Sequence, residues 1–146
     1  MKETYAYAAG LFDGEGTVTL AKDGAKAVFR HPVLSMTSTT YALVLFMQQT
    51  FGGHICRHAA RKEKHSEAWS WRVTSRTALD AAKLLHPYIR EPEKIRRVEL
   101  LLTQYAKVTI RNGKYSPEEL LLKKCFEHEF FHPSEPFNVE TASMSL

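Results

Sequence analysis

Cysteine is scarce in this chain, which narrows the range of scaffolds that the sequence can build. Among 146 residues there are only Cys56 and Cys125, far apart and without CxxC spacing. Cross-linked frameworks belong to small secreted domains with many closely spaced cysteines. We therefore expect two unpaired, buried thiols in a reducing compartment rather than a disulfide.

Long hydrophobic runs are also absent. No segment approaches membrane-spanning length, and the first ten residues, MKETYAYAAG, lack the apolar stretch of a signal peptide. We expect a soluble, intracellular protein, in the cytoplasm or an organelle matrix, without a membrane partner. With 44% hydrophobic and 25% charged residues and no internal repeat, the composition fits one globular domain.

Positive charge is concentrated in the middle of the chain. Residues 17–76 carry a net charge of +6, residues 1–16 carry −2, and residues 77–146 are neutral overall. Such a concentration is typical of a surface that binds a polyanion. The alternative is a solvated basic face without a partner.

Two segments of this basic region predict β-hairpins. In the first, an alternating strand at 17–20 and a strand at 28–37 flank an Asp-Gly turn, and Pro32 indicates an edge or a bulge. In the second, strands at 54–58 and 68–74 flank a polar loop. Trp69, Trp71 and Val73 share the predicted core face of the last strand, leaving its other face polar and basic.

Helical patterns surround the two hairpins. Residues 40–51 form a helix that ends at a Gly-Gly pair, and helices over 77–89 and 93–107 follow the second hairpin. After a turn-rich connector, Ser116-Pro117 starts a last helix over 116–131. The order predicts an α+β fold with a four-stranded antiparallel sheet, helices on one face and a basic opposite face. Such a surface can enter a DNA major groove.

The segment Ala8–Gly16, AAGLFDGEG, is the most informative part of the sequence. Small residues at Ala6, Gly10 and Gly14 recur every fourth position, so they share one helix face on which two helix backbones can touch. The glycines and acids of residues 13–16 predict a helix break there. Glu15 then lies at the end of a close helix pair, beside its symmetry mate if the partner is a second copy.

Two carboxylates at such a junction can bind a divalent cation through oxygen. The alternative is an ordinary helix end with a solvent-facing acid.

This motif and the element order over residues 3–107 resemble LAGLIDADG homing endonucleases that carry one motif per chain. Gly10, Leu11, Asp13 and Gly16 match the motif, and Glu15 takes the place of its last acid. Ala8 replaces the leading leucine. The resemblance implies an αββαββα core over residues 1–107, with residues 108–146 as an extension of the same domain.

The implied function is Mg²⁺- or Mn²⁺-dependent, site-specific cleavage of double-stranded DNA at a long pseudo-palindromic site. The implied enzyme is a saddle-shaped homodimer that serves intron or intein mobility, and its own intron RNA is a further potential partner. A non-cleaving nucleic-acid-binding protein of the same fold, such as an intron RNA maturase or a transcriptional regulator, is the alternative.

The resemblance also assigns roles to residues. Glu15 and the Gly14 carbonyl would bind metal, and Lys94 would balance charge at the phosphate, although Arg96 or Arg97 could take that role. Ser35 stands where the family often has a glutamine. The expected dimer contacts are Ala6, Gly10, Asp13 and Gly14, and Asp13 is expected to accept backbone hydrogen bonds rather than bind metal. The expected DNA contacts are Lys22, Lys26, Arg30, Arg57, Arg61, Lys62, Ser70, Arg72 and Thr74.

Two other histidine patterns point to weaker hypotheses. His54, Cys56 and His58 alternate along a strand, which favours polar residues facing the groove over a metal site. Residues 128–132 read H-E-F-F-H, the zinc-protease pattern, but Pro133 disfavours helical geometry at His132. We therefore expect an amphipathic helix there, packed through its leucines and phenylalanines.

Overall fold

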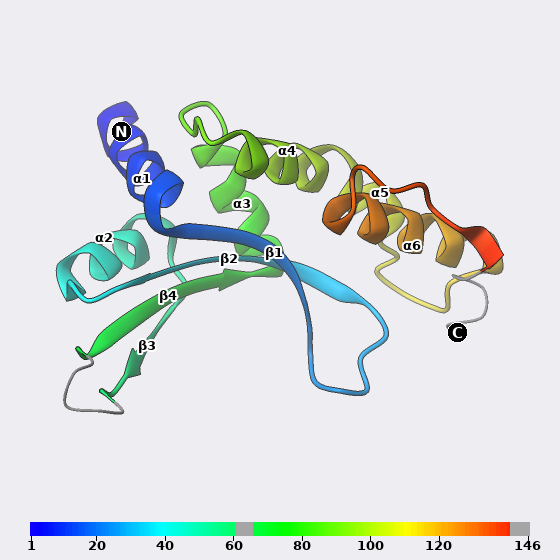
Figure 1. Cartoon of the computed structure of the whole chain (residues 1–146), viewed down its shortest axis with the longest axis horizontal. Helices are drawn as coiled ribbons and strands as arrows, with labels where there is room; N and C mark the ends of the chain where they lie inside the picture. The colour runs from blue at the N-terminus through cyan, green and yellow to red at the C-terminus, as the bar shows by residue number, and fades with distance from the viewer. Residues whose placement is uncertain (61–65, 141–146) are drawn as a thin grey trace. The chain divides into compact units, whose positions relative to one another are not determined.

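The computed structural model describes residues 1–60 and 66–140 (Figure 1). The chain divides into two compact units, Met1–Val98 and Glu99–Leu146. The boundary between these units falls inside a helix, and the expected core over residues 1–107 with an extension of the same domain stays a prediction. A continuous helix crosses the boundary, so no loop or composition change marks it in the sequence.

The first unit contains a four-stranded antiparallel sheet of order β1-β2-β4-β3. The strands are β1 (Gly16–Lys22), β2 (Arg30–Ser38), β3 (His54–His58) and β4 (Ala68–Thr74). Both hairpins are present as predicted, but β1 is longer than the predicted 17–20, and β2 covers Arg30–Ser38 where 28–37 was predicted. Pro32 lies in a central strand, but β4 already ends opposite Val33, so Pro32 has a neighbour on the β1 side only. Its missing N–H therefore costs no ladder bond to β4.

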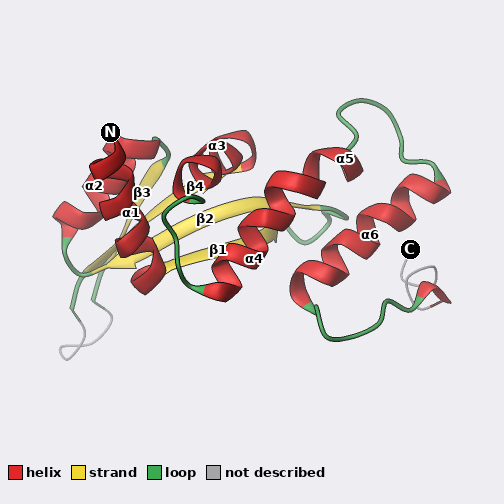
Figure 2. Ribbon diagram, turned by 90° about the horizontal axis from the view of Figure 1, so that it is seen from above, coloured by secondary structure: helices red, strands yellow, loops and turns green. Residues whose placement is uncertain are grey.

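Three helices cover one face of this sheet, α1 (Lys2–Glu15), α2 (Tyr41–Phe51) and α3 (Ser75–Leu85) (Figures 1 and 2). The core between the layers includes Phe12, Leu34, Met47, Trp71 and Leu85, all almost fully buried. The alternation predicted for β4 is confirmed, since Trp71 and Val73 are buried while Arg72 between them is exposed.

The Gly-Gly pair after α2 is required by geometry. Gly52 and Gly53 have φ values of +78° and +95°, in the region that favours glycine. A Cβ atom on Gly53 would lie 2.5 Å from Cγ1 of Val73 and would also strike the Arg72 carbonyl. The Trp71 indole donates to the Gly52 carbonyl at 2.8 Å. The pair therefore brings β3 into close contact with β4.

Helix α1 does not break at Asp13 but runs to Glu15, and Gly16 passes directly into β1 with an extended conformation. The glycine at this position serves close packing and not a left-handed turn. A Cβ atom on Gly16 would collide with the Phe12 ring and would lie 2.6 Å from the Phe12 carbonyl oxygen. Since Phe12 is fully buried, it cannot move aside cheaply.

The second unit is helical. The helix that begins as α4 (Pro92–Leu100) continues through a π-helical turn, η1 (Leu101–Tyr105), into the short α5 (Ala106–Val108). Helix α6 (Pro117–Phe131) begins with a complete capping box between Ser116 and Glu119. The predicted N-cap and first-turn proline of this helix are therefore confirmed.

The packing of α6 differs from the prediction. Its buried residues are Lys123, Phe126 and Phe130, while Leu122 is 59% exposed. The Lys123 ammonium donates to the Thr109 hydroxyl at 2.5 Å and lies 4.3 Å from the Tyr105 ring centroid. Burial lowers the pKa of Lys123, and Glu127 partly opposes this shift.

The zinc-protease pattern does not form its helical geometry. Helix α6 ends at Phe131, and His132 has a non-helical φ of −135°, as expected for a residue that precedes a proline. His128 is hydrogen-bonded to the Glu135 carbonyl at 3.0 Å. No three potential ligands of the His, Cys, Asp or Glu type cluster anywhere in residues 1–60 and 66–140.

Both cysteines are free, as predicted, but they are exposed and not buried. Cys56 lies on the uncovered face of the sheet, where it lines the groove described below. In the described parts of the chain, no helix combines the length and apolar character needed to span a bilayer.

Candidate metal site and sheet groove

Glu15 ends α1 at the point where the chain enters the sheet, and its side chain is exposed. Among the described residues, its carboxylate forms no hydrogen bond or ion pair. The last carbonyls of a helix lack donors within the helix and carry partial negative charge, which includes that of Gly14. An uncommitted carboxylate beside such carbonyls is an all-oxygen donor set of the kind that binds Mg²⁺. The residues present therefore fit a divalent cation.

Asp13 is occupied by the backbone and is not available to a metal. Its carboxylate accepts from the Arg90 N–H at 3.0 and 3.2 Å and from the Glu91 N–H at 3.1 Å. The expected backbone hydrogen bonds are confirmed, but their donors lie in the loop before α4 and not at the helix end itself. Asp13 thus fastens this loop to the end of α1.

The same loop delivers Lys94 to the end of α1. The Glu91 carboxylate accepts from the N–H groups of Glu93 and Lys94 at 3.1 and 2.7 Å, so it caps the start of α4. The Lys94 ammonium then donates to the Asp13 carbonyl at 2.9 Å. A positive charge therefore lies beside the helix end that carries Gly14 and Glu15.

Arg96 and Arg97 are the alternative candidates for the basic side chain that balances charge at the phosphate, but both contact other groups. Both pair with Glu93, at 2.6 and 3.2 Å, and Arg97 also donates to the Val18 carbonyl at 2.8 Å. The hydrogen bond from Arg96 is the largest cause that lowers the pKa of Glu93, and Arg97 adds to it. The geometry thus favours Lys94 for the predicted role.

The small-residue stripe of α1, Ala6, Gly10 and Gly14, is exposed. A Cβ atom added at Gly10 or Gly14 would meet no atom within 4 Å, so nothing in the protomer requires glycine there. The opposite side of the helix, with Ala8, Ala9 and Phe12, is fully buried. A hollow of about 400 Å³ flanks the stripe, between Ala6, Gly10, Asp13 and the loop residues Pro87–Arg90.

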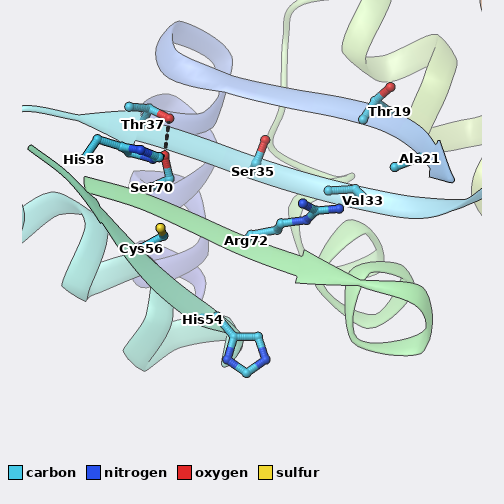
Figure 3. Close-up of a pocket in the computed structure, with 10 residues that line it drawn as sticks. All are labelled: Thr19, Ala21, Val33, Ser35, Thr37, His54, Cys56, His58, Ser70 and Arg72. Carbon is cyan, nitrogen blue, oxygen red and sulfur yellow. Dashed lines mark hydrogen bonds between the residues drawn. The ribbon is translucent and has the colours of Figure 1, made fainter. Parts of the chain in front are cut away.

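The uncovered face of the sheet forms a groove of about 470 Å³, shown in Figure 3. Its lining residues come from all four strands and include no acid: Thr19, Ala21, Val33, Ser35, Thr37, His54, Cys56, His58, Ser70 and Arg72. The prediction that His54, Cys56 and His58 face the groove is confirmed. The Ser70 hydroxyl is hydrogen-bonded to Thr37 at 2.7 Å and to His58 at 2.8 Å. Ser35 lies opposite Thr17, and Thr17 is two residues after Glu15 in the sequence.

Register changes the predicted set of basic contacts. Arg57 pairs across the sheet with Trp69, on the face that the helices cover, and forms an ion pair with Glu67. Lys22 and Arg30 lie opposite each other, two residues along their strands from the buried pair Leu20 and Pro32. They therefore belong to the same face of the sheet as that pair, and not to the groove face. The expectation that strand arginines face the groove is thus wrong for Arg57 and Arg30. A difference of one residue in strand position places a side chain on the opposite face.

Arg72 and Ser70 do line the groove, and Thr74 follows with the same parity. Lys26 is exposed in the β1–β2 connection, while Arg61 and Lys62 lie outside the described residues. Within the described residues, the groove lining thus contains one arginine and no lysine, and it is not strongly basic. Thr19, Ala21, Val33 and Thr37 were absent from the predicted contacts, although the two-residue alternation of their strands would have found them.

The arrangement was compared with known proteins. No family model matches the chain, and no curated protein sequence matches it. Solved structures do. The group I intron-encoded homing endonuclease I-CeuI, complexed with DNA, aligns with 99% of this chain and 76% of its own, with a TM-score of 0.64 and 15% identity.

Two further structures align similarly. The archaeal intron-encoded homing endonuclease I-Vdi141I, complexed with DNA, matches 96% of this chain and 92% of its own, with a TM-score of 0.61 and 14% identity. The LAGLIDADG homing endonuclease I-GzeII, in complex with a DNA target, matches 92% of this chain and 54% of its own, with a TM-score of 0.59 and 13% identity. The chain therefore has the fold of the LAGLIDADG homing endonucleases.

Proposed function

We propose that this protein is a site-specific endonuclease that cleaves both strands of a long, pseudo-palindromic DNA site as a homodimer. The observation that carries the proposal is the end of α1. There, Glu15 is exposed and uncommitted, the Lys94 ammonium is held at the Asp13 carbonyl of the same helix end, and β1 begins one residue later. The three similar solved structures named above are DNA complexes of homing endonucleases, which supports the same class of substrate.

Glu15 and the Gly14 carbonyl would hold Mg²⁺ or Mn²⁺. Such an ion supplies activation of water and stabilisation of the leaving oxygen in phosphodiester hydrolysis. One chain offers only one free carboxylate at this point. Because Mg²⁺ is commonly bound by one or two carboxylates together with waters and substrate phosphates, a second copy and the DNA can complete the set.

Lys94 has a supporting role in this proposal. Its ammonium already lies at the negative end of the α1 dipole, where it lowers the repulsion between Glu15 and an approaching phosphate. Asp13 supports Lys94 indirectly, because its hydrogen bonds hold the loop that leads into α4, the helix that carries Lys94. Ser35, on the groove face near the start of β1, can hydrogen-bond a water.

The proposed dimer is supported by the bare side of α1. The helix face of Ala6, Gly10 and Gly14 is exposed, and a Cβ atom on either glycine would meet nothing within 4 Å, so a second helix backbone can approach closely. Pairing two copies there would bring two Glu15 side chains together. It would also place two sheet grooves side by side, each facing a half-site about one helical turn long.

The decisive experiment is cleavage selection from a randomised DNA library with Mg²⁺. We expect recovery of one long site with two related halves, which would report activity, site length and symmetry together. Such a double-strand break at one long site would be suited to intron or intein mobility. Binding to that site should weaken steeply as salt rises, because phosphate contacts release counterions. Library DNA that is never cut, or affinity that does not respond to salt, would contradict the proposal.

A further inference from the structure

The register of the sheet divides the groove face into rows of different chemistry. Residues directly opposite one another across neighbouring strands form each row. The arginine row consists of Thr17, Ser35, Arg72 and His54. The methyl row, two residues further along β1, consists of Thr19, Val33 and Thr74. The hydroxyl row, on the other side of the arginine row, consists of Thr37, Ser70 and Cys56.

Arg72 is the one fixed positive charge that the described residues place on the groove floor. Its side chain is exposed, and within residues 1–60 and 66–140 its guanidinium has no hydrogen bond or ion pair. Arg57, on the neighbouring strand, is instead paired with Glu67 on the opposite face. An unpaired guanidinium on the floor of a DNA-binding groove matches the two acceptors, O6 and N7, of guanine.

The methyl row presents short apolar groups next to this arginine. Thr19 and Thr74 are half-buried in this row, on either side of Val33, which is almost fully buried and lies beneath them. In Figure 3 the Arg72 side chain extends along the floor toward Val33. Small methyl-bearing side chains match the C5-methyl group of thymine, which no other base carries.

The spacing of the rows sets the distance between the two base positions. Two residues along a strand span about 6.8 Å. Successive nucleotides of one DNA strand are about 3.4 Å apart along the helix axis. The hydroxyl row discriminates less, because serine and threonine hydroxyls contact either kind of base.

We propose that each half-site contains a guanine read by Arg72 and, within about two base pairs on the side of the β1–β2 loop, a thymine read by the methyl row. The inference rests on the proposed function, since it assigns base positions to the same groove. It commits to a base pattern that the cleavage activity alone does not require.

The test is a binding selection from randomised duplex DNA with the full chain, without divalent metal so that cleavage does not contribute. The wild-type chain should select one strong guanine per half-site and a thymine within two base pairs of it. Arg72→Ala should lower the preference for that guanine about five- to hundredfold and leave the other positions unchanged. Arg57→Ala is the matched control, since this arginine lies on the adjacent strand but faces away, and its profile should equal that of the wild type.

The thymine contact can be tested without changing the protein. Replacing the selected thymine by deoxyuridine removes only the methyl group and should weaken binding about fourfold. The same replacement at a thymine opposite the hydroxyl row should have little effect. Equal losses at both places would overturn the assignment of the methyl row.

Three outcomes separate the inference from the proposed function. A wild-type chain that selects no sequence would refute both. A selected site whose guanine preference survives Arg72→Ala would refute the inference and leave the endonuclease proposal standing. A specific loss of one base preference in Arg57→Ala would show that the groove face is assigned wrongly. Thermal unfolding of both arginine variants should match the wild type, because both side chains are exposed.

Discussion

Helix α1 of the first unit and helix α6 of the second depart from ordinary amphipathic packing in opposite ways. In α1, alanine and glycine form an exposed face, while residues on the opposite face are fully buried. In α6, a lysine is buried and a leucine is exposed. The difference teaches that exposure follows the contacts a residue can make, and not its hydropathy.

Each departure has its own physical reason. Lys123 tolerates burial because a hydroxyl and an aromatic face lie within reach of its ammonium inside the second unit. The bare stripe of α1 has no partner within the first unit, so its glycines are left without a structural reason in the protomer. A stripe that the protomer does not use is therefore the better place to look for function.

The most severe test concerns the carboxylate at the end of α1. Glu15→Gln should reduce Mg²⁺-dependent cleavage about a thousandfold or more, because several kcal/mol of transition-state stabilisation depend on the metal. DNA affinity without metal should stay close to that of the wild type. The measurement is single-turnover cleavage of the selected site, with Glu3→Gln at the other end of the helix as the control. Cleavage that survives in Glu15→Gln would remove this residue from the metal site.

The buried side of α1 should be the next most sensitive. Gly16→Ala places a methyl group against the Phe12 ring and carbonyl, and should lower the free energy of unfolding by about 2–3 kcal/mol. Denaturant unfolding measures this loss. If Gly16→Ala is as stable as the wild type, the junction is less tightly packed than the structure indicates.

The open side of α1 should respond in the reverse manner. A Cβ atom at position 10 meets no atom of its own protomer within 4 Å, and leucine favours a helix over glycine, so Gly10→Leu should raise protomer stability by about 0.5–1 kcal/mol. The dimer, in contrast, should dissociate at least about tenfold more readily, since the added side chain separates the paired helices. Sedimentation measures the dissociation constant. A dimer that tolerates leucine here must associate through another surface.

The mildest effect is expected in α6. Lys123→Met replaces a buried charge by an apolar side chain of similar length and should stabilise the protein by about 1 kcal/mol at neutral pH. Because burial lowers the pKa of Lys123, the folded state binds fewer protons than the unfolded state at alkaline pH. The wild type therefore gains stability as pH rises toward the ordinary lysine pKa of about 10.4, and the advantage of Lys123→Met shrinks there.

Thermal unfolding at neutral and alkaline pH checks this prediction. Lys107→Met, an exposed lysine of the same unit, should show neither the gain nor its pH dependence. An advantage that grows with pH would mean that Lys123 is stabilised as a cation by its surroundings.

The strands were predictable because their alternation and turn residues are local signals. Strands β3 and β4 have the predicted bounds, and the tryptophans and valine of β4 lie on the predicted core side. Arg57 shows the limit of such a prediction. Its charge suggested a contact with DNA, but its parity with Trp69 directs it to the other face, where Glu67 pairs with it.

The candidate site brings together residues that are distant in sequence. The motif alone singled out Glu15 and the stripe of small residues, because spacing along one helix is a local property. The contact of Lys94 with the Asp13 carbonyl joins residues 81 positions apart, and it depends on the two N–H groups that Asp13 holds. Only the resemblance to known enzymes indicated Lys94, and only the fold distinguished it from Arg96 and Arg97.

The sequence by itself determined the order of the elements, the helix with a bare side, and the acid at its end, since these follow from periodicity, caps and turns within a few residues. The tertiary structure decided which side chains share the groove, which cation reaches the end of α1, and that a lysine is buried in α6. Those outcomes depend on register and on contacts between distant segments, and no local pattern encodes them.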